Sequence, residues 1–329
     1  MLALACPASL KGVLAPAEAA SALAEGLRRV AGWDVELLPV ADGGEGTADV
    51  LRLALGGEWR RARVADPLGR PVEARWLSLP DGTAFVESAE AVGLGLVAAA
   101  ERDPLRGSSA GLGSLLLAVL ATRPAAVLVG VGGTATVDGG AGLRETLPRW
   151  PDDVPLRVAC DVRNPLLGPR GAARACGPQK GAGREEVEEL ERRLAADRVL
   201  APHRDLPGAG AGGGLGAALA SLGGELVEGA ELVLDAIGFD ARARGAAVAV
   251  TGEGTVDATT LEGKAPGAVL RRCARLGVPC VLFGGRVETE LEGIDVRALG
   301  GDPDCARADL AALGEELARE RSAWIHRNA

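Results

Sequence analysis

Acidic side chains stand among glycines at several places in this chain of 329 residues. The clearest examples are residues 41–47, which read Ala-Asp-Gly-Gly-Glu-Gly-Thr, and residues 252–257, which read Gly-Glu-Gly-Thr-Val-Asp. Glycine lets main-chain N–H groups approach an oxyanion, and carboxylates bind the Mg²⁺ that accompanies a nucleotide. One such loop is more often a tight turn than a site, but several together favour a site for a metal-bound, phosphate-bearing ligand.

Lysine is rare in this chain and occurs only at Lys11, Lys180 and Lys264, whereas Lys and Arg together number 36. Each of the three lysines is next to a glycine. The compact ammonium of lysine and the planar guanidinium of arginine are not interchangeable. A chance survival of surface lysines would not favour glycine loops, so we interpret these three as candidates for contact with phosphate groups.

Standard nucleotide fingerprints are weak in this sequence. There is no Gly-x-x-x-x-Gly-Lys-Ser/Thr motif, and the Gly-x-Gly-x-x-Gly match at residues 208–213 follows no predicted strand. A second match, at residues 130–135, does follow a predicted strand and leaves a nicotinamide-dependent dehydrogenase as a remote alternative.

Composition excludes several classes of protein. The net charge is −9 and aromatic residues make up only 2%, which argues against a nucleic-acid partner. No segment reaches the ~18 consecutive apolar residues of a membrane span. The six cysteines form no Cys-x-x-Cys pair, as expected of buried thiols in a reducing compartment. These features predict a cytoplasmic protein, and a homodimer is one option for its oligomeric state.

Both ends of the chain alternate strand and helix, a pattern typical of a parallel sheet covered on both faces. The apolar runs 2–6, 35–40, 247–250 and 278–283 predict strands. A closing helix is expected to place Leu310, Leu313, Leu317 and Trp324 on one face. We therefore predict a doubly wound, Rossmann- or flavodoxin-like domain from residues 1–57 and 232–329.

The middle of the chain, residues 58–231, is predicted to be an inserted second α/β domain. Residues 58–86 alternate polar and apolar side chains around two turn sequences, 67–69 and 80–82, which predicts an antiparallel meander. Strands at 125–131 and 156–160 and a charged helix near 185–200 follow. Ligands of open parallel sheets bind outside the carboxyl ends of the strands, where the glycine loops fall.

Six segments, in register over nearly the whole chain, resemble the bacterial glycerate kinase type-1 family. The most specific are 39–47, with its Ala-Asp-Gly-Gly-Glu-Gly-Thr string, and the Gly-Pro-Gln-Lys-Gly of residues 177–181. The other four segments are 7–12, 130–142, 159–166 and 251–266. The resemblance implies phosphorylation of D-glycerate by ATP with Mg²⁺, giving 2-phosphoglycerate rather than 3-phosphoglycerate. It also implies a doubly wound domain with an inserted domain and an active site in the cleft between them.

Phosphoryl transfer depends mainly on positioning and charge neutralisation. The catalytic candidates are Lys11, as a cation for the glycerate carboxylate, and Asp42 or Asp161, as acceptor for the proton of the attacking hydroxyl. Glu253 and Asp257 are the candidate Mg²⁺ ligands, because Mg²⁺ prefers oxygen.

The remaining candidates would bind the two substrates. Those for glycerate are Ser9, Gly44, Glu45, Arg163 and Asn164. Those for the nucleotide and its phosphates are Gly132, Gly133, Thr134, Lys180, Gly212, Gly213 and Lys264. For Glu45 and Asp138, helix capping and a catalytic role stay equally open.

Some positions depart from the family pattern. Smaller or apolar residues replace the usual polar ones at five positions, namely Ala8, Val92, Val137, Thr255 and Thr259. If these positions line the active site, the substrate or the turnover itself would change. A relative that binds glycerate or nucleotide without turnover, with a regulatory role, is therefore a second hypothesis.

Overall fold

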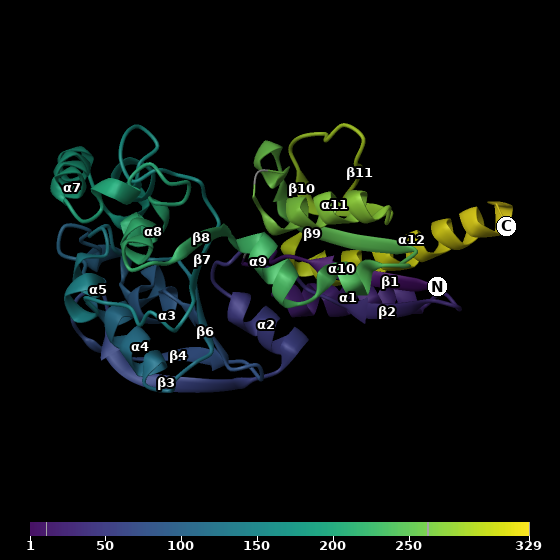
Figure 1. Ribbon diagram of the computed structural model, residues 1–329. Coiled ribbons are helices and arrows are strands. Elements are labelled where there is room, and N and C mark those ends of the chain that lie inside the picture. Colours follow the sequence, from purple (N-terminus) through teal and green to yellow (C-terminus); the bar gives the residue numbers. More distant parts are fainter. Residues whose placement is uncertain (11, 262, 329) are drawn as a thin grey trace. The chain divides into compact units, whose positions relative to one another are not determined.

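The computed structural model describes residues 1–10, 12–261 and 263–328, which fold into two α/β units (Figure 1). The first unit contains Met1–Asp42 and Val233–Ala329, and the second contains Gly43–Leu232. Each unit has its own sheet and its own core of mostly Leu, Val and Ala. The mixed α/β class expected from the sequence is confirmed.

The first unit is built on a five-stranded sheet in which all neighbouring strands run parallel. Its strands are β1 (Leu2–Pro7), β2 (Asp34–Leu37), β9 (Val248–Val256), β10 (Cys280–Val287) and β11 (Asp295–Ala298). Their order across the sheet is β11-β10-β9-β1-β2. Its helices are α1 (Pro16–Arg28), α10 (Phe239–Ala243), α11 (Ala265–Leu276) and α12 (Ala306–Asn328), while α9 (Gly229–Ala236) spans the return of the chain to this unit.

Strand β9 is longer than the sequence predicted. Glu253 was expected in a loop after the strand, but β9 continues to Val256 and pairs with β10 along this extension. Gly252 makes no turn here. A Cβ atom at Gly252 would lie 2.5 Å from the ring of Phe283, so this glycine is needed for close packing within the sheet.

The predicted face of the closing helix α12 is buried only in part. Leu310, Leu313 and Leu317 are buried, but Trp324 is 55% exposed. The end of α12 projects beyond the strands of its own unit (Figure 1). Since α12 is continuous over Ala306–Asn328, the four residues do lie on one face, and only its Trp324 end is exposed.

The second unit is built on a six-stranded sheet that combines both strand orientations. Its strands are β3 (Glu58–Ala65), β4 (Pro71–Ser78), β5 (Thr83–Glu87), β6 (Ala126–Gly130), β7 (Leu156–Cys160) and β8 (Glu225–Glu228), in that order. The predicted meander is present, since β3, β4 and β5 pair antiparallel, whereas β5 to β8 pair parallel. The helices are α2 (Thr47–Leu55), α3 (Ala89–Val92), α4 (Ala110–Leu120), α5 (Ala141–Thr146), α6 (Ala172–Cys176), α7 (Arg184–Ala196) and α8 (Ala211–Ser221).

Residues 43–57 group with the second unit, although the sequence suggested the first. The amide of Ala48 in α2 donates a hydrogen bond to the carboxylate of Glu87 at the end of β5, at 2.8 Å. Asp49 in the same helix forms an ion pair with Arg75 of β4, at 3.6 Å. These contacts attach α2 to the second sheet, so the chain crosses between units before this helix rather than after it.

None of the helices in the described part of the chain is both long enough and apolar enough to cross a membrane.

Candidate active site

Glycine loops of the second unit converge at the carboxyl ends of its parallel strands. We call Gly43, Gly44, Gly132, Gly133, Gly212 and Gly213 the glycine cluster. A Cβ atom at Gly132 would lie 2.9 Å from Cα of Gly44, and one at Gly212 would lie 2.8 Å from the carbonyl oxygen of Val131. Three loops far apart in sequence therefore touch through their main chains, and side chains at these positions would separate them.

The glycine cluster exposes unpaired main-chain donors. In the described part of the chain, the amides of Gly132 and Gly133 have no hydrogen-bond acceptor. The carbonyl of Gly133 accepts from the amide of Leu94, which fixes the peptide from its other side. Donors left open in a fixed loop at a strand end are suited to the oxygens of a phosphate.

Lys180 lies beneath this loop rather than on its surface. It is only 3% exposed, and its Nζ donates to Oγ1 of Thr134 at 2.9 Å and to the carbonyl of Thr136 at 2.7 Å. The hydroxyl of Thr134 in turn donates to the carbonyl of Gly212, at 3.0 Å. Both side chains were expected to contact phosphates directly, but both are used to join segments of the site. Burial lowers the pKa of Lys180 to about 8.

Two exposed carboxylates border the glycine cluster. Oδ2 of Asp161, just after β7, lies 3.9 Å from the position that a Cβ atom would take at Gly132. Oε2 of Glu45 lies 3.7 Å from the corresponding position at Gly133. The structure thus brings the predicted Glu45 and Asp161 together with the glycine cluster, to which Gly44 belongs.

Arg163 and Asn164, also predicted for the substrate, are engaged elsewhere. Arg163 is exposed and forms an ion pair with Glu228 at 3.3 Å. The side-chain amide of Asn164 donates to the carbonyl of Arg170 at 2.6 Å, which closes its own loop. These contacts give both residues a local structural role.

Asp138 proves to be a structural cap. Its carboxylate accepts from the amide and the hydroxyl of Ser109, at 2.8 and 2.7 Å, and from the amides of Gly140 and Gly142 at the start of α5. With four hydrogen bonds to its own unit, this carboxylate ties α4 to α5. The capping alternative therefore accounts for Asp138.

A second cluster of predicted residues, Glu253, Asp257 and Lys264, lies in the first unit, and we call it the Glu253 cluster. Nζ of Lys264, at the N-terminus of α11, is 3.4 Å from the carboxylates of both Glu253 and Asp257. Thr260 donates to Glu253 at 2.8 Å, and Thr259 donates to Asp257 at 2.6 Å. Burial raises the pKa of Glu253, while the hydrogen bond from Thr259 helps to lower the pKa of Asp257. The cluster thus holds two carboxylates around one cation.

The end of β1 lies beside this second cluster. Pro7 pairs with Gly252, and the amide of Ala8 donates to the carbonyl of Gly252 at 2.9 Å, so the Ser9 segment begins beside the residue that precedes Glu253. Asp42 is the last residue of the first unit and is partly buried. Lys11, the predicted partner of the glycerate carboxylate, lies outside the described residues.

Glu253 and Asp257 would fit Mg²⁺ only if the ion took its other ligands from outside the protein. Among the residues that the structure describes, no three His, Cys, Asp or Glu side chains meet at a point that could hold a metal ion. Mg²⁺ in kinases commonly uses one or two carboxylates and takes its other ligands from phosphate oxygens and water. Two carboxylates beside a lysine are consistent with that kind of binding.

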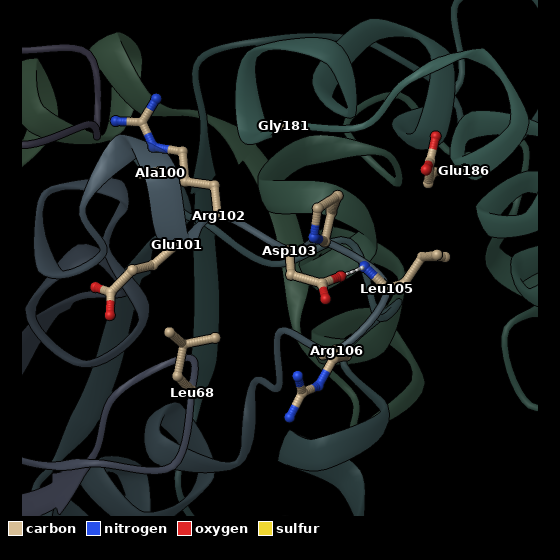
Figure 2. Close-up of a pocket in the computed structure, with 10 residues that line it drawn as sticks. Leu68, Ala100, Glu101, Arg102, Asp103, Leu105, Arg106, Gly181 and Glu186 are labelled. Atoms are coloured by element: carbon tan, nitrogen blue, oxygen red, sulfur yellow. Dashed lines mark hydrogen bonds between the residues drawn. The ribbon is translucent and has the colours of Figure 1, made fainter.

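The second unit has a cavity of about 580 Å³, lined by Leu68, Asp103, Arg106 and Gly181 among others. Figure 2 shows the residues that line it. Asp103 uses its carboxylate to accept from the amide of Leu105, at 3.1 Å. None of the predicted site residues lines this cavity. The predicted residues Gly132, Gly133 and Glu253 lie instead in the glycine cluster and in the Glu253 cluster.

Glu87 contacts the segment after the Gly43 and Gly44 loop, and the sequence did not single it out. It ends β5, is only 6% exposed, and binds the start of α2, which directly follows the loop of Gly43 and Gly44. The available signal was an acid at the end of an apolar run, which also describes many ordinary strand ends.

Glycine loops, a buried lysine and paired carboxylates at the ends of parallel strands define an α/β protein built to handle phosphorylated ligands. Residues 3–148 and 144–301 match the model of the glycerate kinase family. The chain is 38% identical to the glycerate 2-kinase of Escherichia coli K12 over 87% of this chain and 85% of the relative. It is 36% identical to the glycerate kinase of Bacillus subtilis 168, over 88% of this chain and 86% of that relative.

A solved structure from Salmonella typhimurium LT2, named for glycerate kinase 2, superposes with a TM-score of 0.87. It is 33% identical, and 99% of each chain is covered. The chain therefore belongs to the glycerate kinase family, and the resemblance found in its sequence motifs is confirmed.

The close packing of the glycine cluster predicts an unequal effect of alanine at two left-handed glycines. Gly213 (φ +79°) would place a Cβ atom 2.0 Å from the carbonyl oxygen of Thr136, whereas Gly223 (φ +92°) has open space around it. Gly223→Ala should lower the free energy of unfolding by about 1–2 kcal/mol and Gly213→Ala by about 3–5 kcal/mol, as overpacking adds to backbone strain. Urea denaturation of both variants would measure this, and equal losses would contradict the packing argument.

Proposed function

We propose that this protein transfers the γ-phosphoryl group of ATP to D-glycerate and that its product is 2-phosphoglycerate. Family membership supports the kinase reaction, and the name of the Escherichia coli relative supports the 2-position. The observation that carries the proposal is that the amides of Gly132 and Gly133 have no acceptor among the described residues, in a loop fixed by Lys180. Such donors stabilise phosphate oxygens without reorganisation during transfer.

The remaining roles follow from position and charge. Asp161, beside Gly132, is our candidate acceptor for the proton of the attacking hydroxyl, and Asp42 is the alternative. Glu253 and Asp257 would hold Mg²⁺, which when bound neutralises charge on the phosphates. Lys264 would add a positive charge beside them. Lys11 and Ser9 are kept as candidates for the glycerate carboxylate. The predicted interdomain cleft stays a prediction.

The departures from the family pattern give little support to a protein that binds without turnover. Val92 and Val137 are fully buried in the cores of the second unit, so they do not belong to the surface of the site. Thr259 supplies Asp257 with a hydrogen bond. Ala8 and Thr255 are the two departures at which the loss of the usual polar group could still affect the reaction.

Purified protein with ATP, Mg²⁺ and D-glycerate tests the proposal. ADP should form in equal amount with a phosphoglycerate whose phosphorus and proton NMR spectra identify the 2-isomer. L-glycerate is the matched control for the substrate. Binding of glycerate and ATP without ADP formation would overturn the kinase assignment, and the 3-isomer would overturn only the position.

A further inference from the structure

The carboxylate of Glu87 is buried at the start of α2 and has main-chain partners there. Its Oε1 accepts from the amide of Ala48 at 2.8 Å, and the carboxylate also receives a hydrogen bond from the amide of Gly46. The two ends of the Glu87–Ala48 contact are 39 residues apart in sequence. A single side chain therefore joins the end of β5 to the loop that carries Gly44 and Glu45.

That loop is rich in glycine, which sets few conformational constraints of its own. Gly43 and Gly46 adopt left-handed conformations (φ +89° and +88°). Gly46 is the N-cap of α2 but has no side chain with which to cap the helix. Glu87 supplies this cap from another strand, and a negative charge is favoured at a helix N-terminus.

We infer that Glu87 is a positioning residue of the site: its carboxylate fixes the main chain of residues 43–46 so that Gly44 and Glu45 stay against Gly132 and Gly133. The inference rests on the proposed kinase reaction. Glu87 is not a catalytic residue in this account, because it acts on the loop and not on the substrates.

Two carboxylates and one guanidinium surround Glu87 from the elements packed against it. Asp49 of α2 and Glu90 of α3 disfavour its ionisation, while Arg75 of β4 pairs with both of them, at 3.6 and 2.7 Å. Burial, the largest influence, raises the pKa of Glu87 to about 7. A protonated carboxyl loses acceptor capacity, so below pH 7 one of the two main-chain amides is held less well.

Glu87→Gln tests the inference, because the amide retains one acceptor oxygen and loses the other. At pH 8 the variant should show about a tenfold lower kcat/KM, the scale of one lost hydrogen bond to a charged group. At pH 5.5 the wild-type carboxyl is itself protonated, so the two proteins should differ little. If the ratio of kcat/KM between variant and wild type were the same at pH 8 and pH 5.5, the inference would be overturned.

Asp66→Asn is the matched control. Asp66 is a buried carboxylate that also accepts from two main-chain amides, those of Leu68 and Arg70, in a turn without candidate site residues. The kcat/KM of the Asp66→Asn variant, relative to that of the wild type, should not change with pH. If Asp66→Asn reproduced the pH-dependent loss of Glu87→Gln, a general effect of buried carboxylates would replace the positioning role.

A second measurement separates this inference from the proposed function. Hydrogen exchange of the main-chain amides of residues 43–50, corrected for intrinsic rates, should be faster in Glu87→Gln than in wild type at pH 8. Unchanged exchange would overturn the inference whether or not the protein has activity. Faster exchange in a protein without glycerate kinase activity would instead contradict the proposed function and leave the tie between Glu87 and the loop established.

Discussion

Lys180→Met should reduce transition-state stabilisation by about 2–4 kcal/mol, measured as the fall in kcat/KM for glycerate phosphorylation. The ammonium of Lys180 holds Thr134 and the carbonyl of Thr136, and therefore the loop with the unpaired amides of Gly132 and Gly133. Methionine has a similar length but cannot donate. The loop would relax, and donors displaced from the phosphate oxygens lose most of their effect.

The same substitution should also lower the free energy of unfolding, by about 1–3 kcal/mol, because the carbonyl of Thr136 would lose its donor in a buried place. A solvated lysine in direct contact with phosphate, the role that the sequence suggested, would instead contribute little to folding. Urea denaturation of the variant measures it, and an unchanged midpoint would contradict the buried role.

The pKa of Lys180 adds a dependence on pH. Burial lowers it from 10.5 to about 8, so the folded protein releases this proton at a lower pH than the unfolded chain. This group therefore makes the free energy of unfolding rise as pH increases from about 8 to 10.5. We expect kcat/KM to fall as pH rises through about 8, because the positive charge beneath the loop of Gly132 and Gly133 is lost.

Lys180→Arg is the control, because its guanidinium stays charged. It should recover part of the activity lost in Lys180→Met and show no fall in kcat/KM near pH 8. A flat profile in the wild type as well would mean that Nζ acts only as a hydrogen-bond donor, since a neutral amine retains two N–H groups.

Patterns local in sequence predicted much of the fold and part of the site. Alternation of polar and apolar side chains marked the meander of β3, β4 and β5, and apolar runs followed by glycines and acids marked the ends of β6 and β7. The loops that gather around Gly132 could be named in advance because parallel strands end at one edge of a sheet.

Contacts between distant segments were beyond such patterns. The rarity of lysine singled out Lys180, but nothing near it in sequence indicates that Thr134 and Thr136 would enclose it. Likewise, no pattern in the sequence around Glu87 indicates that it binds Ala48, which is 39 residues away. The glycine at 252 suggested a turn, whereas close packing on Phe283 is an equally good reason for a glycine and is visible only in three dimensions.

Lys264→Met should also cost about 2–4 kcal/mol of transition-state stabilisation, but with a different pattern of stability. Lys264 is 3.4 Å from both Glu253 and Asp257, and it balances their charge where we propose that Mg²⁺ and phosphate bind. Its side chain is 30% exposed, so solvent screens its ion pairs, and the free energy of unfolding should change by less than about 1 kcal/mol.

Arg29→Met is the matched control for Lys264→Met. Arg29 also bridges two carboxylates, Glu25 and Glu315, at 3.0 and 3.3 Å, but on the outer helices of the same unit. It should keep wild-type kcat/KM. The decisive comparison is between the lysines: Lys180→Met should lose activity and stability together, whereas Lys264→Met should lose activity alone. If Lys264→Met kept full turnover, the Glu253 cluster would have no part in the reaction, because its only described cation could be removed without effect.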